Sequence, residues 1–181
     1  MSNQQTDNDS IGFSYKVGLR IETAKENQIV LDCYSGHGHI WNEVKKRTSF
    51  KFSITSIDTR NDKTNVYLKG DNIKYLKAMN LDSFDIIDLD SYGIPFKQLE
   101  IIFKKKYKGI IHATFIQSGM GRINNGLLLS LGYTKTMIKK CPTLFSKNGY
   151  EKFKYYLANH SILKVNELSL SNKHYLYFKL K

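Results

Sequence analysis

Short apolar runs alternate along most of the chain with segments in which apolar residues recur every three or four positions. The runs predict buried β-strands, and the recurring positions predict amphipathic helices. The expected strands are 28–33, 51–58, 66–69, 83–90, 109–117, 161–168 and 175–180. The expected helices lie near 38–48, 71–79, 95–106, 127–131 and 147–159. This order predicts an α/β fold of Rossmann-like type. Its sheet is mainly parallel and seven-stranded, with helices on both faces and a C-terminal antiparallel β-hairpin.

Three segments do not follow this alternation. Residues 1–12 have no periodicity and are expected to form a flexible tail before a single domain over 13–181. The segment 15–26 is ambiguous between helix and strand, and we expect it to lie across the mouth of a ligand site. The segment 118–147 is irregular and punctuated by glycines, so it is a candidate substrate-binding region.

The stretch 28–45 contains the first half of a βαβ unit, in which a strand, a glycine turn and a helix follow one another. Asp32 ends the apolar run, and Gly36 and Gly38 form the turn. Glycine allows a positive φ and a close approach of the backbone to a ligand, and the helix beyond offers free N–H groups. A nucleotide-like cofactor is therefore expected at this turn.

Acidic side chains end four of the expected strands. They are Asp32, Asp58, Asp71 just beyond the third strand, and the pair Asp88 and Asp90. Because the carboxyl ends of parallel strands meet at one edge of a sheet, these acids are expected near the cofactor. Asp58 follows Gly36 by 22 residues (58 − 36), which suits hydrogen bonds to ribose hydroxyls. A dinucleotide site needs a third glycine where this chain has Trp41, so nicotinamide and flavin dinucleotides are disfavoured.

The segment Leu31-Asp-Cys-Tyr-Ser-Gly-His-Gly38 resembles motif I of the class I S-adenosyl-L-methionine (SAM)-dependent methyltransferases, in a form common among nucleic-acid methyltransferases. Asp58 resembles the motif II acid, and 70–72 resembles the adenine-contacting segment of that family. The closing hairpin matches as well, so the resemblance covers roughly 28–180 and implies SAM as the cofactor. The implied cofactor-binding residues are Asp32, Tyr34, Gly36, Gly38, Asp58, Asp71 and Asn72.

The segment Asp88-Leu-Asp-Ser-Tyr-Gly-Ile-Pro-Phe96 resembles motif IV of amino-group methyltransferases, in the form found in tRNA guanine-N2 dimethyltransferases. By that resemblance Asp90 contacts the target amino group and Tyr92 stacks on the base. Asp88 and Ser91 complete the implied catalytic set, although Ser91 stands where that family has proline. The alternative is that Asp88 and Asp90 only end a strand and that Tyr92 packs on the next helix.

The net charge of the chain indicates the class of partner that it binds. Lys and Arg number 28 against 16 Asp and Glu, which gives a net charge of +12. Such an excess favours a polyanion such as nucleic acid, although lysine as a default surface residue would give the same charge. The expected contacts to phosphates and unpaired bases come from the irregular segment, through Arg122, Lys135, Lys139 and Lys140, with Tyr133 and Phe145 nearby.

The remaining features bear on location and metal chemistry. No apolar stretch is long enough for a transmembrane helix, and the polar, acidic start of the chain is unlike a signal peptide. Cys33 and Cys141 lie far apart and suggest neither a disulfide framework nor a zinc site, which favours a reducing cytoplasmic setting. No histidine spacing indicates a metal.

The sequence therefore predicts a SAM-dependent methyltransferase for an exocyclic amino nitrogen of a nucleic-acid base, with RNA favoured over DNA. Two alternatives stay open. One is a methyltransferase for a small molecule or a protein, and the other is a catalytically silent module that binds nucleic acid or a partner.

Overall fold

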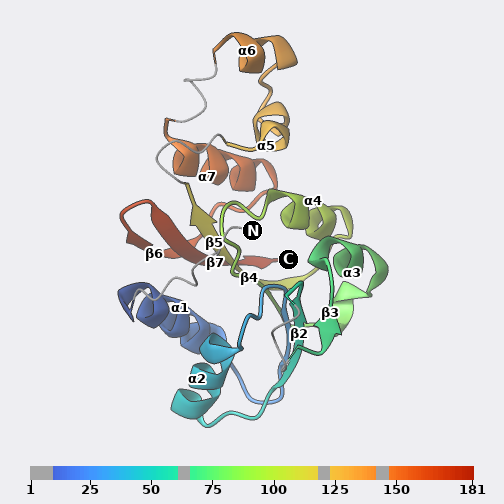
Figure 1. Cartoon of the computed structure of the whole chain (residues 1–181), viewed down its shortest axis with the longest axis vertical. Helices are drawn as coiled ribbons and strands as arrows, with labels where there is room; N and C mark the ends of the chain where they lie inside the picture. The colour runs from blue at the N-terminus through green and yellow to red at the C-terminus, as the bar shows by residue number, and fades with distance from the viewer. Residues whose placement is uncertain (1–9, 61–65, 118–122, 142–146) are drawn as a thin grey trace.

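The computed structural model describes residues 10–60, 66–117, 123–141 and 147–181. A seven-stranded sheet in the order β3-β2-β1-β4-β5-β7-β6 forms its centre (Figure 1). The strands are β1 (Ile29–Asp32), β2 (Ser53–Asp58), β3 (Leu68–Lys69), β4 (Ile86–Leu89), β5 (Gly109–Ile116), β6 (Asn166–Leu170) and β7 (Lys173–Leu180). The helices are α1 (Ser10–Thr23), α2 (His39–Thr48), α3 (Asn72–Ala78), α4 (Phe96–Lys104), α5 (Asn125–Ser130), α6 (Lys135–Lys140) and α7 (Gly149–Asn159), with a 3-10 turn η1 (Leu81–Ser83).

The strand pairing confirms the predicted mixed sheet. β1 pairs in parallel with both β2 and β4, β2 with β3, and β4 with β5. β7 runs antiparallel between β5 and β6, so the closing hairpin inserts its second strand into the sheet. The direction of winding reverses between β1 and β4, and such a switch point is where an open α/β sheet binds its ligands.

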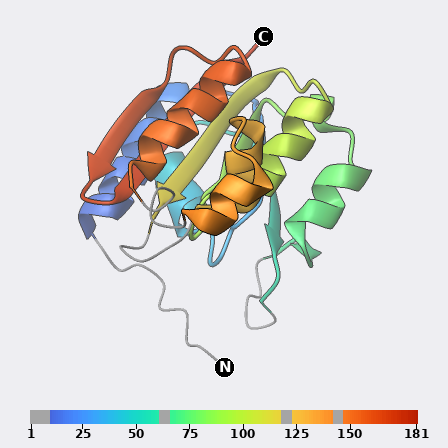
Figure 2. The same cartoon turned by 90° about the horizontal axis from the view of Figure 1, so that it is seen from above.

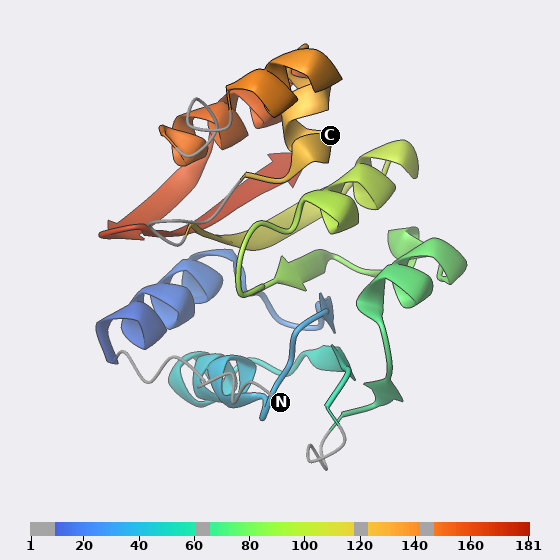
Figure 3. The ribbon, with the colours of Figure 1, turned by 45° about the horizontal axis from the view of Figure 1, so that its top comes forward.

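Two layers of helices cover the sheet (Figure 3). On one face, α1 and α2 bury Val17, Trp41 and Val44 against Val30 and Ile86. On the other face, α3, α4 and α7 pack on the larger core, and α7 runs along β5 (Figure 2). α5 and α6 lie beyond α7, away from α1 and α2 (Figure 1). The layers confirm the prediction of helices on both faces.

Several boundaries differ from the sequence prediction. α1 begins at Ser10, so residues 10–12 belong to a helix and not to the tail, and the ambiguous segment 15–26 is mostly helical. α6 was not predicted, although Thr134 caps it by accepting a hydrogen bond from the amide of Met137 at 3.2 Å. Residues 1–9 of the expected tail and residues 61–65, between the second and third expected strands, lie outside the described part of the chain.

The sixth strand starts later than predicted. Ser161 has φ +64°, and its amide and that of Ile162 donate to carbonyls of the last turn of α7. The chain therefore folds back after α7, and Ile162 joins the core below the helix. Residues 161–165 end a helix in this way, and strand pairing begins at Asn166. No helix in the described residues is long and apolar enough to span a membrane.

Candidate active site

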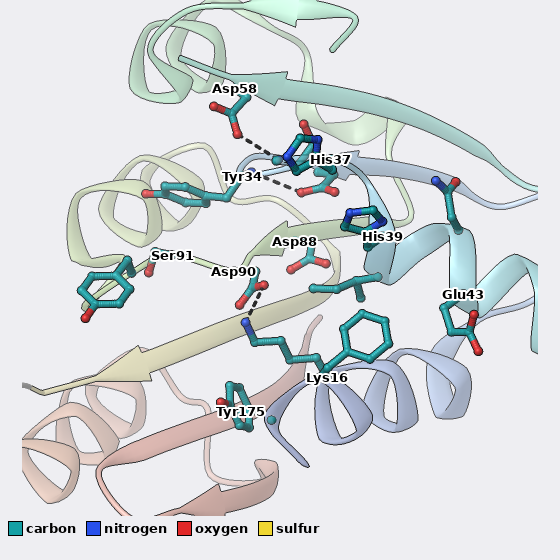
Figure 4. A pocket seen from close by; sticks show the side chains of 18 of the residues that line it. Lys16, Tyr34, His37, His39, Glu43, Asp58, Asp88, Asp90, Ser91 and Tyr175 are labelled. Carbon is teal, nitrogen blue, oxygen red and sulfur yellow. Dashed lines mark hydrogen bonds and ion pairs between the residues drawn. The ribbon is translucent and has the colours of Figure 1, made fainter. Parts of the chain in front are cut away.

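A cavity of about 1150 Å³ opens at the carboxyl ends of β1, β2 and β4 (Figure 4). Its walls come from the glycine turn after β1, from residues 58–60 after β2 and from residues 88–92 at the end of β4. α1 closes the remaining side with residues from Ser10 to Lys16. Of the segment 15–26, which was expected at the mouth of the site, Lys16 lines the cavity; the other lining residues of α1 lie at 10–14, before that segment.

The glycine turn has the geometry that its sequence predicted. Gly36 and Gly38 have φ of +53° and +73°, in the left-handed region that side chains disfavour. The amide of Gly36 donates to Asp58 Oδ2 at 2.8 Å, which ties the turn after β1 to the end of β2. A Cβ on Gly36 would lie 3.1 Å from Arg60 Nη2. The turn thus needs glycine for its backbone conformation, and a side chain at Gly36 would also displace the end of Arg60.

Asp58 is a buried carboxylate held by several donors. Besides Gly36, the amide of Arg60 donates to it at 2.9 Å, and the Arg60 guanidinium lies 3.3 and 3.4 Å from its two oxygens. Burial raises the pKa of Asp58, but the hydrogen bonds and the charge of Arg60 outweigh it and leave the pKa below its ordinary value. Arg60 was not predicted as a site residue, because a lone arginine two residues after an acid belongs to no motif.

Asp32 and Tyr34 also line the cavity. Asp32 is buried and accepts a hydrogen bond from the amide of Tyr34 at 3.2 Å. Burial, together with the nearby charge of Asp88, raises the pKa of Asp32 well above its usual value. The Tyr34 hydroxyl accepts from Gln98 Nε2 at 2.5 Å, so α4 fixes this ring in the wall.

Asp71 and Asn72 have structural roles at the start of α3. Asp71 caps the helix by accepting a hydrogen bond from the amide of Ile73 at 2.9 Å. Asn72 is buried; its side-chain amide donates to the Cys33 carbonyl at 2.8 Å, and its side-chain oxygen accepts from Gln98. Neither residue is among those that line the cavity.

Asp88 is engaged inside the core. Arg20 donates to its two oxygens from Nη2 at 2.6 Å and from Nε at 2.7 Å, and Trp41 Nε1 donates to Oδ2 at 2.7 Å. Arg20 and Asp88 are 2% and 1% exposed, so this ion pair is sealed from water. Asp88 borders the cavity, but its carboxylate fastens α1 and α2 to β4, as in the alternative in which it has a structural role.

Asp90 faces the cavity from the end of β4. It accepts a hydrogen bond from Thr114 Oγ1 at 2.5 Å and forms an ion pair with Lys16 Nζ at 2.9 Å. Burial raises the pKa of Asp90, but Lys16 and Arg20 outweigh it and hold the pKa below its ordinary value. Asp90 is therefore an ionised acceptor at neutral pH. Lys16 lies in the segment that was ambiguous between helix and strand, and no role was predicted for it.

Ser91 and Tyr92 complete this wall of the cavity. Ser91 is buried, and its hydroxyl lies 3.4 Å from the Thr114 carbonyl. Tyr92 is 75% exposed, so the alternative in which it packs on the next helix is wrong. Its ring is available at the mouth of the cavity for a flat ligand to stack on.

The expected substrate contacts lie elsewhere. Lys135, Lys139 and Lys140 are exposed on α6, which lies in the opposite helix layer from α1 and α2, and none of them lines the cavity. Tyr133 packs partly against the larger core. Arg122 and Phe145 lie outside the described residues.

Solved structures with the same fold include several methyltransferases. A SAM-dependent methyltransferase from Aquifex aeolicus aligns with a TM-score of 0.56 at 15% identity, over 97% of this chain and 95% of its own. A proposed rRNA methylase from Clostridium thermocellum aligns with a TM-score of 0.55 at 12% identity, over 96% and 97%. Precorrin-6y C5,15-methyltransferase from Geobacter metallireducens aligns with a TM-score of 0.53 at 12% identity, over 100% and 94%.

No protein-family model and no curated protein matches the sequence. At identities this low the structural similarity establishes the fold. The chain has the class I SAM-dependent methyltransferase fold, with its candidate site at the switch point of the sheet.

Proposed function

We propose that the protein is a SAM-dependent methyltransferase that acts on an exocyclic amino nitrogen of a nucleic-acid base, with RNA favoured over DNA. The observation that carries this proposal is the composition of one cavity. At the switch point of a methyltransferase fold, the cavity joins a glycine turn and Asp58 at one end to Asp90 and Tyr92 at the other.

The residues present fit SAM. The positive φ of Gly36 and Gly38 leaves the turn without side chains where the cofactor backbone would approach. Asp58 supplies carboxylate oxygens suited to ribose hydroxyls, and the buried Asp32 suits a nearby positive charge. When bound, SAM supplies an electrophilic methyl group on a sulfonium ion. The cavity of about 1150 Å³ is large enough for a nucleoside-sized cofactor together with an acceptor.

The acceptor end suits a neutral aromatic amine. Asp90 is ionised and accepts hydrogen bonds, so it can hold an amino N–H and direct the nitrogen lone pair toward the methyl group. Tyr92 is exposed at the mouth and can stack on the ring. These residues hold and orient the acceptor, which is how most of the rate gain in such a transfer would arise.

The choice of nucleic acid rests on charge and resemblance. The net charge of +12 favours a polyanion, and Lys135, Lys139 and Lys140 are exposed cations on α6, away from the cavity. The segment after β4 resembles that of tRNA guanine-N2 dimethyltransferases, and one structural relative is a proposed rRNA methylase. A base inside a duplex would have to be flipped out to reach Asp90, which favours an unpaired base.

The test combines binding and transfer. Calorimetry with SAM and with S-adenosylhomocysteine measures cofactor affinity, and transfer of a labelled methyl group is then measured separately to RNA, DNA, protein and small-molecule pools. Transfer to RNA supports the proposal. Binding without transfer to any pool would indicate the silent module, and transfer only to protein or to a small molecule would indicate the other alternative.

Two variants separate the ends of the cavity. Asp90→Ala is expected to abolish transfer and to leave the cofactor affinity within about twofold of wild type. Asp90→Asn removes the same negative charge and keeps the shape of the side chain. Asp58→Ala is expected to weaken cofactor binding by about 10-fold or more, because a charge-assisted hydrogen bond contributes about 1.5–3 kcal/mol. Full activity of Asp90→Ala would contradict the assignment of the acceptor end.

A further inference from the structure

Two ion pairs join α1 to the end of β4. Lys16 and Arg20 are four residues apart on α1, and their partners Asp90 and Asp88 are two residues apart along the chain. Four residues of a helix advance about 6 Å, and two residues of extended chain advance about 6.6 Å. The spacing of the two cations along α1 therefore matches the spacing of the two carboxylates. Arg20 also donates from Nη1 to the Lys16 carbonyl at 2.9 Å, which links the two pairs. The buried Arg20–Asp88 pair thus fixes where Lys16 lies.

Lys16 is held inside the acceptor end of the cavity. Its side chain is 16% exposed, and its ammonium lies 2.9 Å from Asp90 and 5.4 Å from the centre of the Tyr175 ring. Figure 4 shows Lys16 reaching from α1 to Asp90, with Tyr175 beside it. An ammonium has three N–H donors, and within the described part of the chain the ion pair with Asp90 uses one of them. The ammonium can therefore also donate to a ligand next to Asp90, while the Tyr175 ring lies beside it.

We propose that Lys16 is a substrate-binding residue that reads the ring atom next to the target amino group. Asp90 accepts a hydrogen bond from the amino N–H, and Lys16 donates to an unprotonated ring nitrogen bonded to the same carbon. The acceptor is then an amino base with an N–C=N edge, which adenine, cytosine and the N2–N3 side of guanine all present. This inference rests on the proposed function and identifies the ring atom beside the amino group that the acceptor site would contact.

The charge of this end of the cavity supports a neutral base. Lys16 and Asp90 balance each other, and Arg20 balances Asp88 behind them. A carboxylate acceptor would meet Asp90, and a cationic amine would meet Lys16, each at short range with little water to screen the repulsion. A neutral base with one donor and one adjacent acceptor satisfies both members of the pair without displacing either.

The test uses base analogues and a variant of Lys16. Each acceptor oligonucleotide that the wild-type protein methylates is remade with the ring nitrogen beside the amino group replaced by C–H. The analogues are 1-deazaadenine, 3-deazacytosine and 3-deazaguanine. For the wild-type protein we expect kcat/KM to fall by about 10- to 100-fold, because a hydrogen bond from a charged donor contributes about 1.5–3 kcal/mol.

Lys16→Met keeps a long apolar stem and removes the donors. We expect Lys16→Met to lose about 10-fold or more in kcat/KM with the natural base, mainly through KM, and to lose nothing further with the deaza analogue. Lys16→Arg is expected to restore part of the discrimination. The matched control is Lys25→Met, an exposed lysine just beyond α1, which should behave as wild type. Circular dichroism and affinity for S-adenosylhomocysteine check that each variant is folded.

The outcomes separate the two proposals. Loss of discrimination in Lys16→Met supports the inference. Transfer that is equally fast with natural and deaza bases in the wild-type protein, or equal discrimination by Lys16→Met, overturns the role of Lys16 and leaves the methyltransferase proposal standing. Absence of transfer to any nucleic acid contradicts the proposed function, and the role of Lys16 falls with it.

Discussion

Four acids that share one edge of the sheet have different environments. Asp58 and Asp90 have lowered pKa values because cations lie beside them, whereas the pKa of Asp32 is raised by burial. Asp88 is sealed in an ion pair. The sequence predicted that these acids would gather, because parallel strands end at one edge. It could not predict their environments, because the partners Lys16, Arg20 and Arg60 lie outside the motifs and meet the acids only in the folded chain.

Asp32 is expected to reduce stability at neutral pH. Its folded pKa is raised above 3.8, so the unfolded chain releases this proton first, and stability falls as pH rises through the window between 3.8 and the raised value. Asp32→Asn removes this component. We expect it to increase the free energy of unfolding at pH 7, because the variant no longer buries a carboxylate whose charged form is disfavoured there.

Urea denaturation of wild type and Asp32→Asn between pH 4 and 8 measures this effect, and the difference should grow with pH. The exposed Asp82→Asn is the matched control and should change stability by less than about 0.5 kcal/mol. We also expect Asp32→Asn to bind SAM more weakly than wild type, because the variant lacks the carboxylate. Asp32 would then contribute to cofactor binding while it lowers stability. A variant that is less stable than wild type at pH 7 would contradict this account of Asp32.

Arg60 is expected to compete with the cofactor for Asp58. The Arg60 guanidinium lies beside Gly36 and donates hydrogen bonds of 3.3 and 3.4 Å to Asp58. Its side chain is 38% exposed. These long, partly exposed contacts cost little to break. We expect Arg60→Ala to bind S-adenosylhomocysteine about 3- to 10-fold more tightly by calorimetry, a gain of about 1 kcal/mol. Arg47→Ala, on the exposed face of α2, should have no effect, and weaker binding by Arg60→Ala would show that Arg60 assists the cofactor instead.

At the scale of elements, apolar spacing predicted the strands better than the helices. β1, β4 and β5 are largely buried, and their apolar residues predicted them even though Asp88, His112 and Thr114 interrupt the runs. α1 was ambiguous because Val17, Leu19 and Ile21 alternate as in a strand. Its buried face is completed by Arg20, a residue that sequence patterns assign to the surface. The helical pattern of α1 was therefore not recognised in the sequence, because one position of its buried face is an arginine that is paired with Asp88 in the core.

The Arg20–Asp88 pair is expected to hold α1 on the sheet. Arg20→Met leaves the Asp88 carboxylate buried without its cation, and such a loss typically costs about 3–5 kcal/mol. Replacing both partners, as Arg20→Met with Asp88→Leu, should recover most of that loss because no buried charge remains. Urea denaturation of the two single variants and the double variant forms the cycle that measures this coupling.

The exposed pair between Arg47 and Glu43 on α2 is the comparison for this cycle. Its coupling energy should be only about 0.3–0.5 kcal/mol, as for other helix pairs four residues apart. If the double variant of Arg20 and Asp88 is as unstable as Arg20→Met alone, the cost arises from packing and not from the unpaired carboxylate.

At the scale of the whole molecule, the basic surface and the cavity are separate. The cavity opens beside α1 and α2, whereas the lysines of α6 lie in the other helix layer. Charge and composition indicated a polyanion, but they could not locate this surface because exposed lysines follow no spacing rule.

The α6 lysines are expected to set the salt dependence of RNA binding. Replacing Lys135, Lys139 and Lys140 by Gln should weaken binding to single-stranded RNA and reduce the slope of log affinity against log salt by about 2, since each phosphate contact contributes about 0.7. Affinity for S-adenosylhomocysteine should not change. Filter binding at several salt concentrations measures the slope. Gln at Lys104, Lys105 and Lys106, near the end of α4, removes equal charge and should leave the slope nearly unchanged.

The position of β7 between β5 and β6 has a consequence for folding. Residues 109–116 pair with residues 173–180, so β5 has no neighbour on that side until the chain has passed Lys173. A ribosome adds about 5–20 residues per second, so the backbone groups on this edge of β5 remain unpaired for several seconds after β5 is synthesised. β6 is synthesised before β7 but lies on the far side of β7 from β5. If β6 paired with β5 first, it would occupy the position that β7 takes in the native sheet. The nascent chain therefore passes through a stage with an open strand edge that is prone to self-association, and slow translation of residues 117–172 should prolong it.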